Sequence, residues 1–150
     1  MYHSINKYSY TLDILHFIDV LILNESEAES LTGISVSNDI QAIQASAKLI
    51  DGGVGKVVLT FGNKGSLFTD SNGTVIHVLA FNVQAVDTTV AGDTFIGVLA
   101  ATTGSNNITE ETLRFASAAA AIKITRKGAL ESIPNKSEIE EFLIVTTSKK

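Results

Sequence analysis

The chain has 150 residues, of which 45% are hydrophobic, and a formal net charge of −5 at neutral pH. This length suits one domain with a sizeable core, and the acidic balance argues against a nucleic-acid-binding or membrane-binding surface. The absence of cysteine excludes disulfide and thiolate chemistry. No apolar run reaches the length of a membrane span, and the first ten residues lack the apolar core of a signal peptide, so we expect a cytoplasmic protein.

The first half of the chain alternates between short apolar runs and helical patterns. These patterns predict a short helix at 12–17, a buried parallel strand at 19–23, and helices at 24–33 and 38–53. Asn24 is typical of a helix N-cap, Glu27 is placed as its capping-box partner, and Gly33 is placed to end the helix. This capping interpretation accounts for Asn24 and Glu27 without assigning them a function.

A second apolar run, at 56–60, predicts another buried strand, followed at once by a turn that contains Gly62 and Gly65. Glycines in such a turn let the backbone approach a ligand closely, although turns of this kind are also common between ordinary elements. Beyond it, residues 66–69 and 74–79 flank the sequence Asp70-Ser71-Asn72-Gly73, which strongly predicts a β-hairpin.

The most informative stretch is Val86–Phe95. Asp87 and Asp93 are the only charged residues between Asp70 and Glu110, so we expect two carboxylates within an apolar interior. The pattern predicts a strand end at 81–86, a turn of small residues at 88–92, and a helix from Asp93 onward.

A helix that begins after such a turn presents free N–H groups and the positive end of its dipole, which favour phosphate binding. In that position Asp93 would take a proton from an attacking hydroxyl, while the amides of Val90, Ala91 and Gly92 form an anion hole for a transferring phosphoryl group. The alternative is that Asp93 only stabilises the helix start, as acidic residues often do.

Two further helices are predicted, at 109–124 and 137–143. In the first, Ala118–Ala121 would let a neighbouring helix or a flat ligand come close. Arg126 and Lys127 follow that helix, where two cations can also simply be solvated at its negative end.

The run Asp87-Thr88-Thr89-Val90-Ala91-Gly92-Asp93-Thr94-Phe95 resembles the C-terminal signature of the ribokinase (phosphofructokinase B-type) family of sugar kinases. Val90 stands where that signature has Gly or Ala, and a β-branched residue would be strained if the turn requires a positive φ. The resemblance implies a ribokinase-like three-layer α/β/α fold with a mainly parallel sheet and an antiparallel hairpin, truncated at its N-terminal side. Residues 1–150 would then form one unit, the C-terminal nucleotide-binding half of that domain.

Other segments extend the resemblance and imply an ATP site. By motif position Asn24 lies near the nucleotide phosphates, Glu27 organises the hydration shell of Mg²⁺, and Ser117 faces the adenine. The implied ATP-binding set is Asn24, Thr60, Gly62, Gly65, Gly92, Asp93 and Ser117.

The turn Thr125-Arg126-Lys127-Gly128-Ala129 resembles the family segment that helps to hold an activating K⁺. The implied contributors to that cation site are Asp87, Thr89, Lys123, Arg126, Gly128 and Ser132. Lys123 stands where a small or apolar residue is usual, so its ammonium would repel or replace the cation if it reaches the loop.

The resemblance implies ATP-dependent phosphorylation of a sugar hydroxyl, with ribose at O5 preferred and Asp93 as the base. It covers only about the C-terminal half of the family's fold and leaves out the half that supplies the lid and holds the sugar, so we expect the chain alone to be weakly active or inactive. The alternative is a non-catalytic nucleotide-binding remnant or interaction module. Either form would expose a sheet edge able to pair with a complementary half or a second copy.

Overall fold

The computed structural model describes residues 14–104 and 107–148. They form two compact units: one holds Leu67–His77 and the described residues before Asn63, and the other holds Asn63–Ser66 and the described residues from Val78 onward. The predicted helix at 12–17 begins outside the described part, and its described residues show a short helical turn. None of the helices in the described ranges has the length and apolar composition needed to cross a bilayer.

The first unit is built on a four-stranded sheet of order β1-β2-β3-β4. The strands are β1 (Val20–Asn24), β2 (Lys56–Thr60), β3 (Ser66–Asp70) and β4 (Val75–Val78). β1 and β2 are parallel, in a register that runs from Val20 opposite Lys56 to Asn24 opposite Thr60. The later neighbours are joined by connections too short for a parallel crossover, so they run antiparallel. The predicted α/β class and hairpin are confirmed, and the sheet formed by these four strands is mixed.

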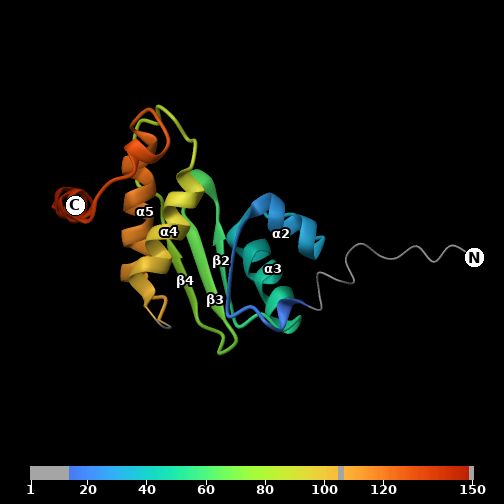
Figure 1. Ribbon diagram of the computed structural model, residues 1–150. Helices are drawn as coiled ribbons and strands as arrows, with labels where there is room; N and C mark the ends of the chain where they lie inside the picture. The colour runs from blue at the N-terminus through green and yellow to red at the C-terminus, as the bar shows by residue number, and fades with distance from the viewer. Residues whose placement is uncertain (1–13, 105–106, 149–150) are drawn as a thin grey trace, which may run out of the picture. The chain divides into compact units, whose positions relative to one another are not determined.

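Two helices, α2 (Glu25–Thr32) and α3 (Asp39–Asp51), provide the crossover between β1 and β2 and lie together beside the sheet (Figure 1). The predicted caps are present. Asn24 and Glu27 form a reciprocal capping box, Gly33 ends α2 with φ 72°, and the Asn38 side chain accepts a hydrogen bond at the start of α3. Because these signals act within one turn of helix, the sequence was sufficient to locate both helix starts.

Strand β1 is more exposed than predicted. Leu23 is buried, but Val20 is 38% exposed, because β1 is an end strand of the sheet whose only strand neighbour among the described residues is β2. β2 has neighbours on both sides and buries Val57, Val58 and Leu59. The expectation of a fully buried first strand was therefore wrong, and the outer edge of β1 has no strand partner among the described residues.

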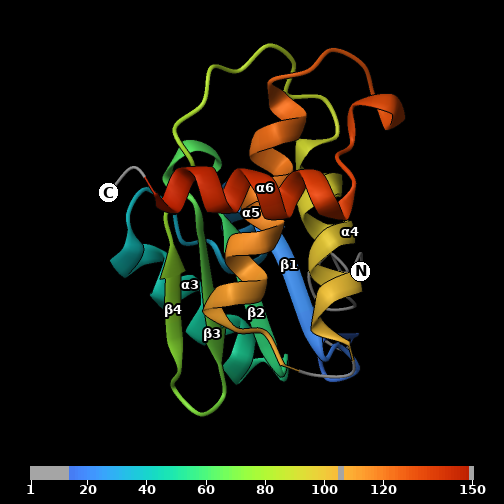
Figure 2. The ribbon, with the colours of Figure 1, turned by 90° about the vertical axis from the view of Figure 1, so that its left-hand side faces the viewer.

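The second unit contains α4 (Ala91–Thr103), α5 (Glu110–Ile124) and α6 (Lys136–Thr147). α4 and α5 lie side by side, and α6 crosses α5 (Figure 2). Their core includes Ala118, Ala119 and Ile139, so the alanine run serves helix packing. The last helix is longer than the predicted 137–143, because Asn135 caps it one residue before Lys136 and its apolar run Phe142–Val145 extends past Leu143, so that the helix ends at Thr147.

The predicted strand end at 81–86 is wrong, since this segment has no regular secondary structure. The N–H groups of Val86, at the end of this segment, and of Asp87, which follows it, do not pair with a strand. Both donate to the Ile124 carbonyl, at 2.7 and 3.0 Å. The segment is thus attached to the C-terminal end of α5. An apolar run shows that a segment can be buried but does not show which backbone groups it will pair with.

Candidate functional site

In the first unit, the predicted nucleotide residues lie at the carboxyl ends of β1 and β2. Asn24 ends β1, and Thr60 stands opposite it at the end of β2. The Glu27 N–H donates to Asn24 Oδ1 and the Asn24 N–H donates to Glu27 Oε2, both at 2.9 Å. In open α/β sheets, ligands bind outside the carboxyl ends of parallel strands. The structure therefore brings Asn24, Glu27 and Thr60 together where a ligand is expected, while the capping box gives the first two a structural role.

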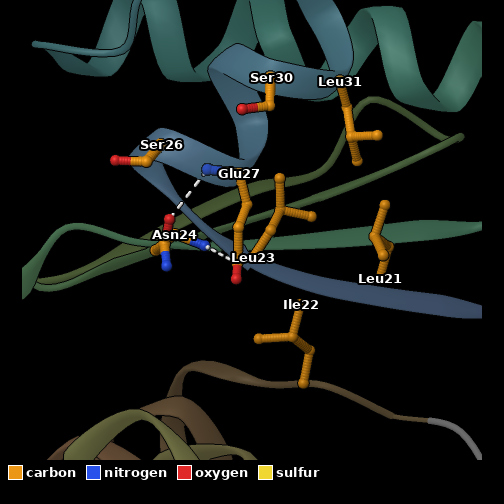
Figure 3. Close-up of a pocket in the computed structure, with 8 residues that line it drawn as sticks. All are labelled: Leu21, Ile22, Leu23, Asn24, Ser26, Glu27, Ser30 and Leu31. Carbon is orange, nitrogen blue, oxygen red and sulfur yellow. Dashed lines mark hydrogen bonds between the residues drawn. The ribbon is translucent and has the colours of Figure 1, made fainter. Parts of the chain in front are cut away.

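Beside these residues, β1 and α2 border an open hollow of about 500 Å³ (Figure 3). It is lined by Leu21, Ile22, Leu23, Asn24, Ser26, Glu27, Ser30 and Leu31. Most of its wall is aliphatic, with Asn24 and Glu27 at one end. We did not predict Ser26 and Ser30 as lining residues. They are four positions apart in α2, and this spacing places both side chains on the same face of the helix.

The two glycines that follow β2 differ in their surroundings. Gly62 has φ +54° and open space where a Cβ would lie. Gly65 has φ +105°, and a Cβ there would overlap the Val78 carbonyl oxygen. Of these two glycines, only Gly62 leaves room for a ligand to approach. At position 65, packing against the Val78 carbonyl is enough to require glycine.

In the second unit, the predicted anion hole lies at the start of α4. Asn24, Asn38, Thr109 and Asn135 supply side-chain caps to α2, α3, α5 and α6, whereas α4 has Val90 at its N-cap and no side-chain cap. The Ala91 N–H donates to Thr88 O at 3.2 Å. First-turn amides such as those of Gly92 and Asp93 have no partner within their own helix, so this end is suited to an anion.

Asp93 lies in that first turn and is exposed, and Asp87 is 28% exposed. The expectation of two carboxylates in an apolar interior was therefore wrong for this chain. The uncharged stretch between Asp70 and Glu110 instead supplies residues such as Phe95 and Leu99 to the buried face of α4. The Asp93 carboxylate is therefore accessible from solvent.

Val90 has φ 53°, a left-handed conformation that is costly for a β-branched residue. We expect Val90→Gly to raise the free energy of unfolding by about 0.5–1 kcal/mol, since the relief of strain exceeds glycine's entropic cost. Ala91→Gly, one residue later in the ordinary helical region, is the matched control and should lower it by about 0.5–1 kcal/mol. Urea denaturation measures both, and equal destabilisation by the two changes would show that Val90 stores no strain.

Asp87 organises the loop before α4. Its Oδ1 accepts the Thr89 N–H at 2.9 Å and its Oδ2 accepts the Gly128 N–H at 3.1 Å. Hydrogen bonds from Thr89 foremost, and then from Gly128, lower the pKa of Asp87 to about 2. Asp87 is consequently ionised near neutral pH, and it joins two segments 41 positions apart.

Lys123 reaches the same loop. Its side chain is fully buried, and its Nζ donates to the Asp87 carbonyl at 2.9 Å and lies 3.9 Å from Asp87 Oδ2. Ser132 also lies nearby in sequence, where its hydroxyl is within hydrogen-bonding distance of the Gly128 and Ala129 carbonyls, at 2.8 and 2.7 Å. The structure thus brings Asp87, Thr89, Lys123, Gly128 and Ser132 into one hydrogen-bonded network.

The remaining predicted residues are placed differently. The Arg126 side chain pairs with Glu138 at 2.7 Å and does not extend freely into solvent. Arg126 foremost, and then Asn135, lowers the pKa of Glu138. Glu138 was not predicted as a partner of Arg126; the structure shows that it also forms a capping box with Asn135, at 2.8 and 3.0 Å. Ser117 is buried within α5.

Comparisons with known proteins place these features in a family. Residues 5–136 match the model of the pfkB family of carbohydrate kinases. Ribokinase from Haemophilus influenzae is 42% identical over 131 residues, which is 87% of this chain and 42% of that protein. Deoxyribokinase from Salmonella typhi is 37% identical over 125 residues, which is 83% of this chain and 40% of that protein.

Solved structures agree. Arabidopsis thaliana ribokinase complexed with ribose and ATP superposes with a TM-score of 0.83 at 37% identity, covering 88% of this chain and 43% of that one. The chain therefore spans less than half the length of the relatives it matches. It has a ribokinase-like α/β fold and belongs to the pfkB family of carbohydrate kinases.

Proposed function

We propose that this chain is the nucleotide-binding half of an ATP-dependent sugar kinase whose acceptor is ribose, phosphorylated at O5. The observation that supports this most is the uncapped start of α4 with the exposed Asp93 in its first turn. The named activity of the relative at 42% identity, and a related structure with ribose and ATP, favour ribose over other sugars. The cytoplasmic location remains a prediction from the sequence.

In the proposed reaction, the Asp93 carboxylate accepts the proton of the sugar hydroxyl as that oxygen bonds to the γ-phosphorus and ADP leaves. The backbone amides of Val90, Ala91 and Gly92 stabilise the negative charge on the transferred group. For the Ala91 amide, an incoming phosphate has to displace its 3.2 Å bond to Thr88 O. That bond lies at the long end of the normal range for N–H···O hydrogen bonds.

We propose that ATP contacts residues of the ATP-binding set that the family resemblance implies. In this proposal, Asn24 and Thr60 contact the nucleotide from the ends of β1 and β2. The open space beside Gly62 lets the nucleotide come close to the backbone there. Gly92, Asp93 and Ser117 are proposed as further contacts of ATP, whereas Gly65 is not, because the Val78 carbonyl oxygen already occupies the space beside it. Glu27 is exposed, and its carboxylate fits the outer hydration shell of Mg²⁺, which when bound neutralises phosphate charge.

A bound K⁺ does not fit the cation site that the family resemblance implies around Asp87, Lys123 and Gly128. Oxygens of the implied ligands Asp87, Lys123 and Gly128 already accept hydrogen bonds from the chain's own donors. One of those donors is the Lys123 ammonium itself.

The edge of β1 is the proposed docking position for the sugar-binding part of the enzyme. It combines a strand edge that has no strand partner among the described residues with the aliphatic wall formed by Leu21, Ile22 and Leu31. The relatives have more than half their length outside the matched region, which is enough chain to supply this complement. Without it, the acceptor hydroxyl is not held in line, and such positioning is worth about 7–11 kcal/mol of the barrier.

Complementation tests the proposal. The chain is co-expressed with the portion of Haemophilus influenzae ribokinase outside the matched region, and ADP release is followed with and without ribose. The proposal predicts ribose-dependent ADP release from the mixture and little from either part alone. Two folded, associated parts that release no ADP would favour the non-catalytic remnant. Failure to associate would contradict the docking of the complement on β1.

A further inference from the structure

Lys123 is a fully buried lysine in the last turn of α5. A buried ammonium is strongly unfavourable unless it is paired and hydrogen-bonded. Its Nζ meets this requirement with the Asp87 carbonyl at 2.9 Å, and Asp87 Oδ2 at 3.9 Å supplies the opposite charge. The lysine therefore acts as a cation with one defined position.

The oxygens around this position are already satisfied by the polypeptide. Asp87 Oδ2 accepts the Gly128 N–H, and the Lys123 carbonyl accepts the Arg126 N–H at 3.0 Å. The Gly128 carbonyl lies within hydrogen-bonding distance of the Ser132 hydroxyl. A free monovalent cation would have to share these oxygens with the chain's own donors and also approach an ammonium of like charge.

The ammonium also fixes the segment that leads into α4. The N–H groups of Val86 and Asp87 donate to the Ile124 carbonyl, and Lys123 Nζ returns a bond to the Asp87 carbonyl. Two consecutive residues of the loop are thereby held at the C-terminal end of α5. Helix α4 begins only four positions later, at Ala91, so the position of its first-turn amides depends on this attachment.

We propose that Lys123 is a positioning residue whose ammonium takes the place of a free monovalent cation beneath the turn that leads into α4. The chain consequently holds this turn in place without K⁺. What the turn does rests on the proposed kinase function, but the attachment itself does not, so it can be tested on the isolated chain without any activity.

The test is thermal unfolding in KCl and in tetramethylammonium chloride at equal ionic strength of about 0.15 M, where screening of charges is the same. The wild-type chain should have equal melting temperatures in the two salts. Lys123→Met keeps most of the buried stem but vacates the Nζ position. In tetramethylammonium chloride its melting temperature should be lower than that of the wild-type chain by about 5 °C or more. KCl should restore a substantial part of this loss.

Lys127→Met is the matched control, because Lys127 is exposed in the adjoining turn. It should show no difference between the salts. A lysine that only packs would lose stability on substitution without any selective recovery in K⁺, so a folded Lys123→Met chain with equal melting temperatures in both salts would overturn the proposal. So would a K⁺-specific rise in the wild-type chain.

A second measurement decides the matter if Lys123→Met does not fold. Equilibrium dialysis of the wild-type chain against Rb⁺, used as a K⁺ probe, should show no saturable site. Stoichiometric Rb⁺ binding that is lost in Asp87→Asn would overturn the proposal. None of these outcomes depends on sugar phosphorylation, so failure of the kinase proposal is recognised separately by the complementation assay.

Discussion

Replacing Asp93 by Asn is expected to lower ribose-dependent ADP release in the complemented enzyme by about 10²–10⁴-fold, the usual contribution of a positioned general base. The substitution keeps the size of the side chain and removes its capacity to accept the proton. Asp93 is exposed in the first turn of α4, so the free energy of unfolding should change little, with only the favourable interaction of the charge with the helix dipole being lost.

The matched control is Glu110→Gln, which removes a carboxylate from the first turn of α5. It tests whether loss of any acid at a helix start reduces the rate, and its activity should equal that of the wild type. If Asp93→Asn retained the same rate as Glu110→Gln while both proteins were folded, Asp93 would not be the base.

Gly65→Ala is the second change expected to have a large effect. A Cβ at this position overlaps the Val78 carbonyl oxygen, a backbone atom that cannot move independently, and φ is +105°. Strain and overpacking together should lower the free energy of unfolding by at least about 3 kcal/mol. Urea or thermal denaturation of the purified chain measures this loss.

Gly62→Ala is the comparison within the same turn, because φ is also positive but the space for a Cβ is open. The left-handed conformation alone should cost about 1–2 kcal/mol, and the chain should remain folded. Equal losses for the two substitutions would contradict the assignment of a packing role to Gly65 and an open approach to Gly62.

The parts of the fold that were predictable from the sequence depend on interactions within a few residues. The capping box of Asn24 and Glu27 and the glycine end of α2 lie within ten positions. The hairpin turn is equally local: Asp70 Oδ1 accepts the N–H groups of Thr74 and Asn72, both at 2.9 Å, and the first of these bonds contributes most to the lowered pKa of Asp70. Side-chain chemistry alone determines such features.

The features that were not predicted depend on long-range pairing. The segment at 81–86 has the composition of a strand, but its end is bonded to Ile124, which lies in a helix far along the chain. The exposure of β1 and Asp93 depends on which elements pack against them, which no local pattern records. Lys123 was recognised as unusual, but only the structure shows its ammonium at the Asp87 carbonyl, 36 positions away in sequence.

Calorimetric titration of the isolated, folded chain with Mg-ATP tests most directly whether it is a nucleotide-binding half. Asn24→Asp is the informative variant, because it preserves the capping oxygen that accepts the Glu27 N–H while adding negative charge beside the proposed phosphate position. We expect saturable binding by the wild-type chain and clearly weaker binding by Asn24→Asp at unchanged stability. A folded wild-type chain that binds no Mg-ATP would contradict the account.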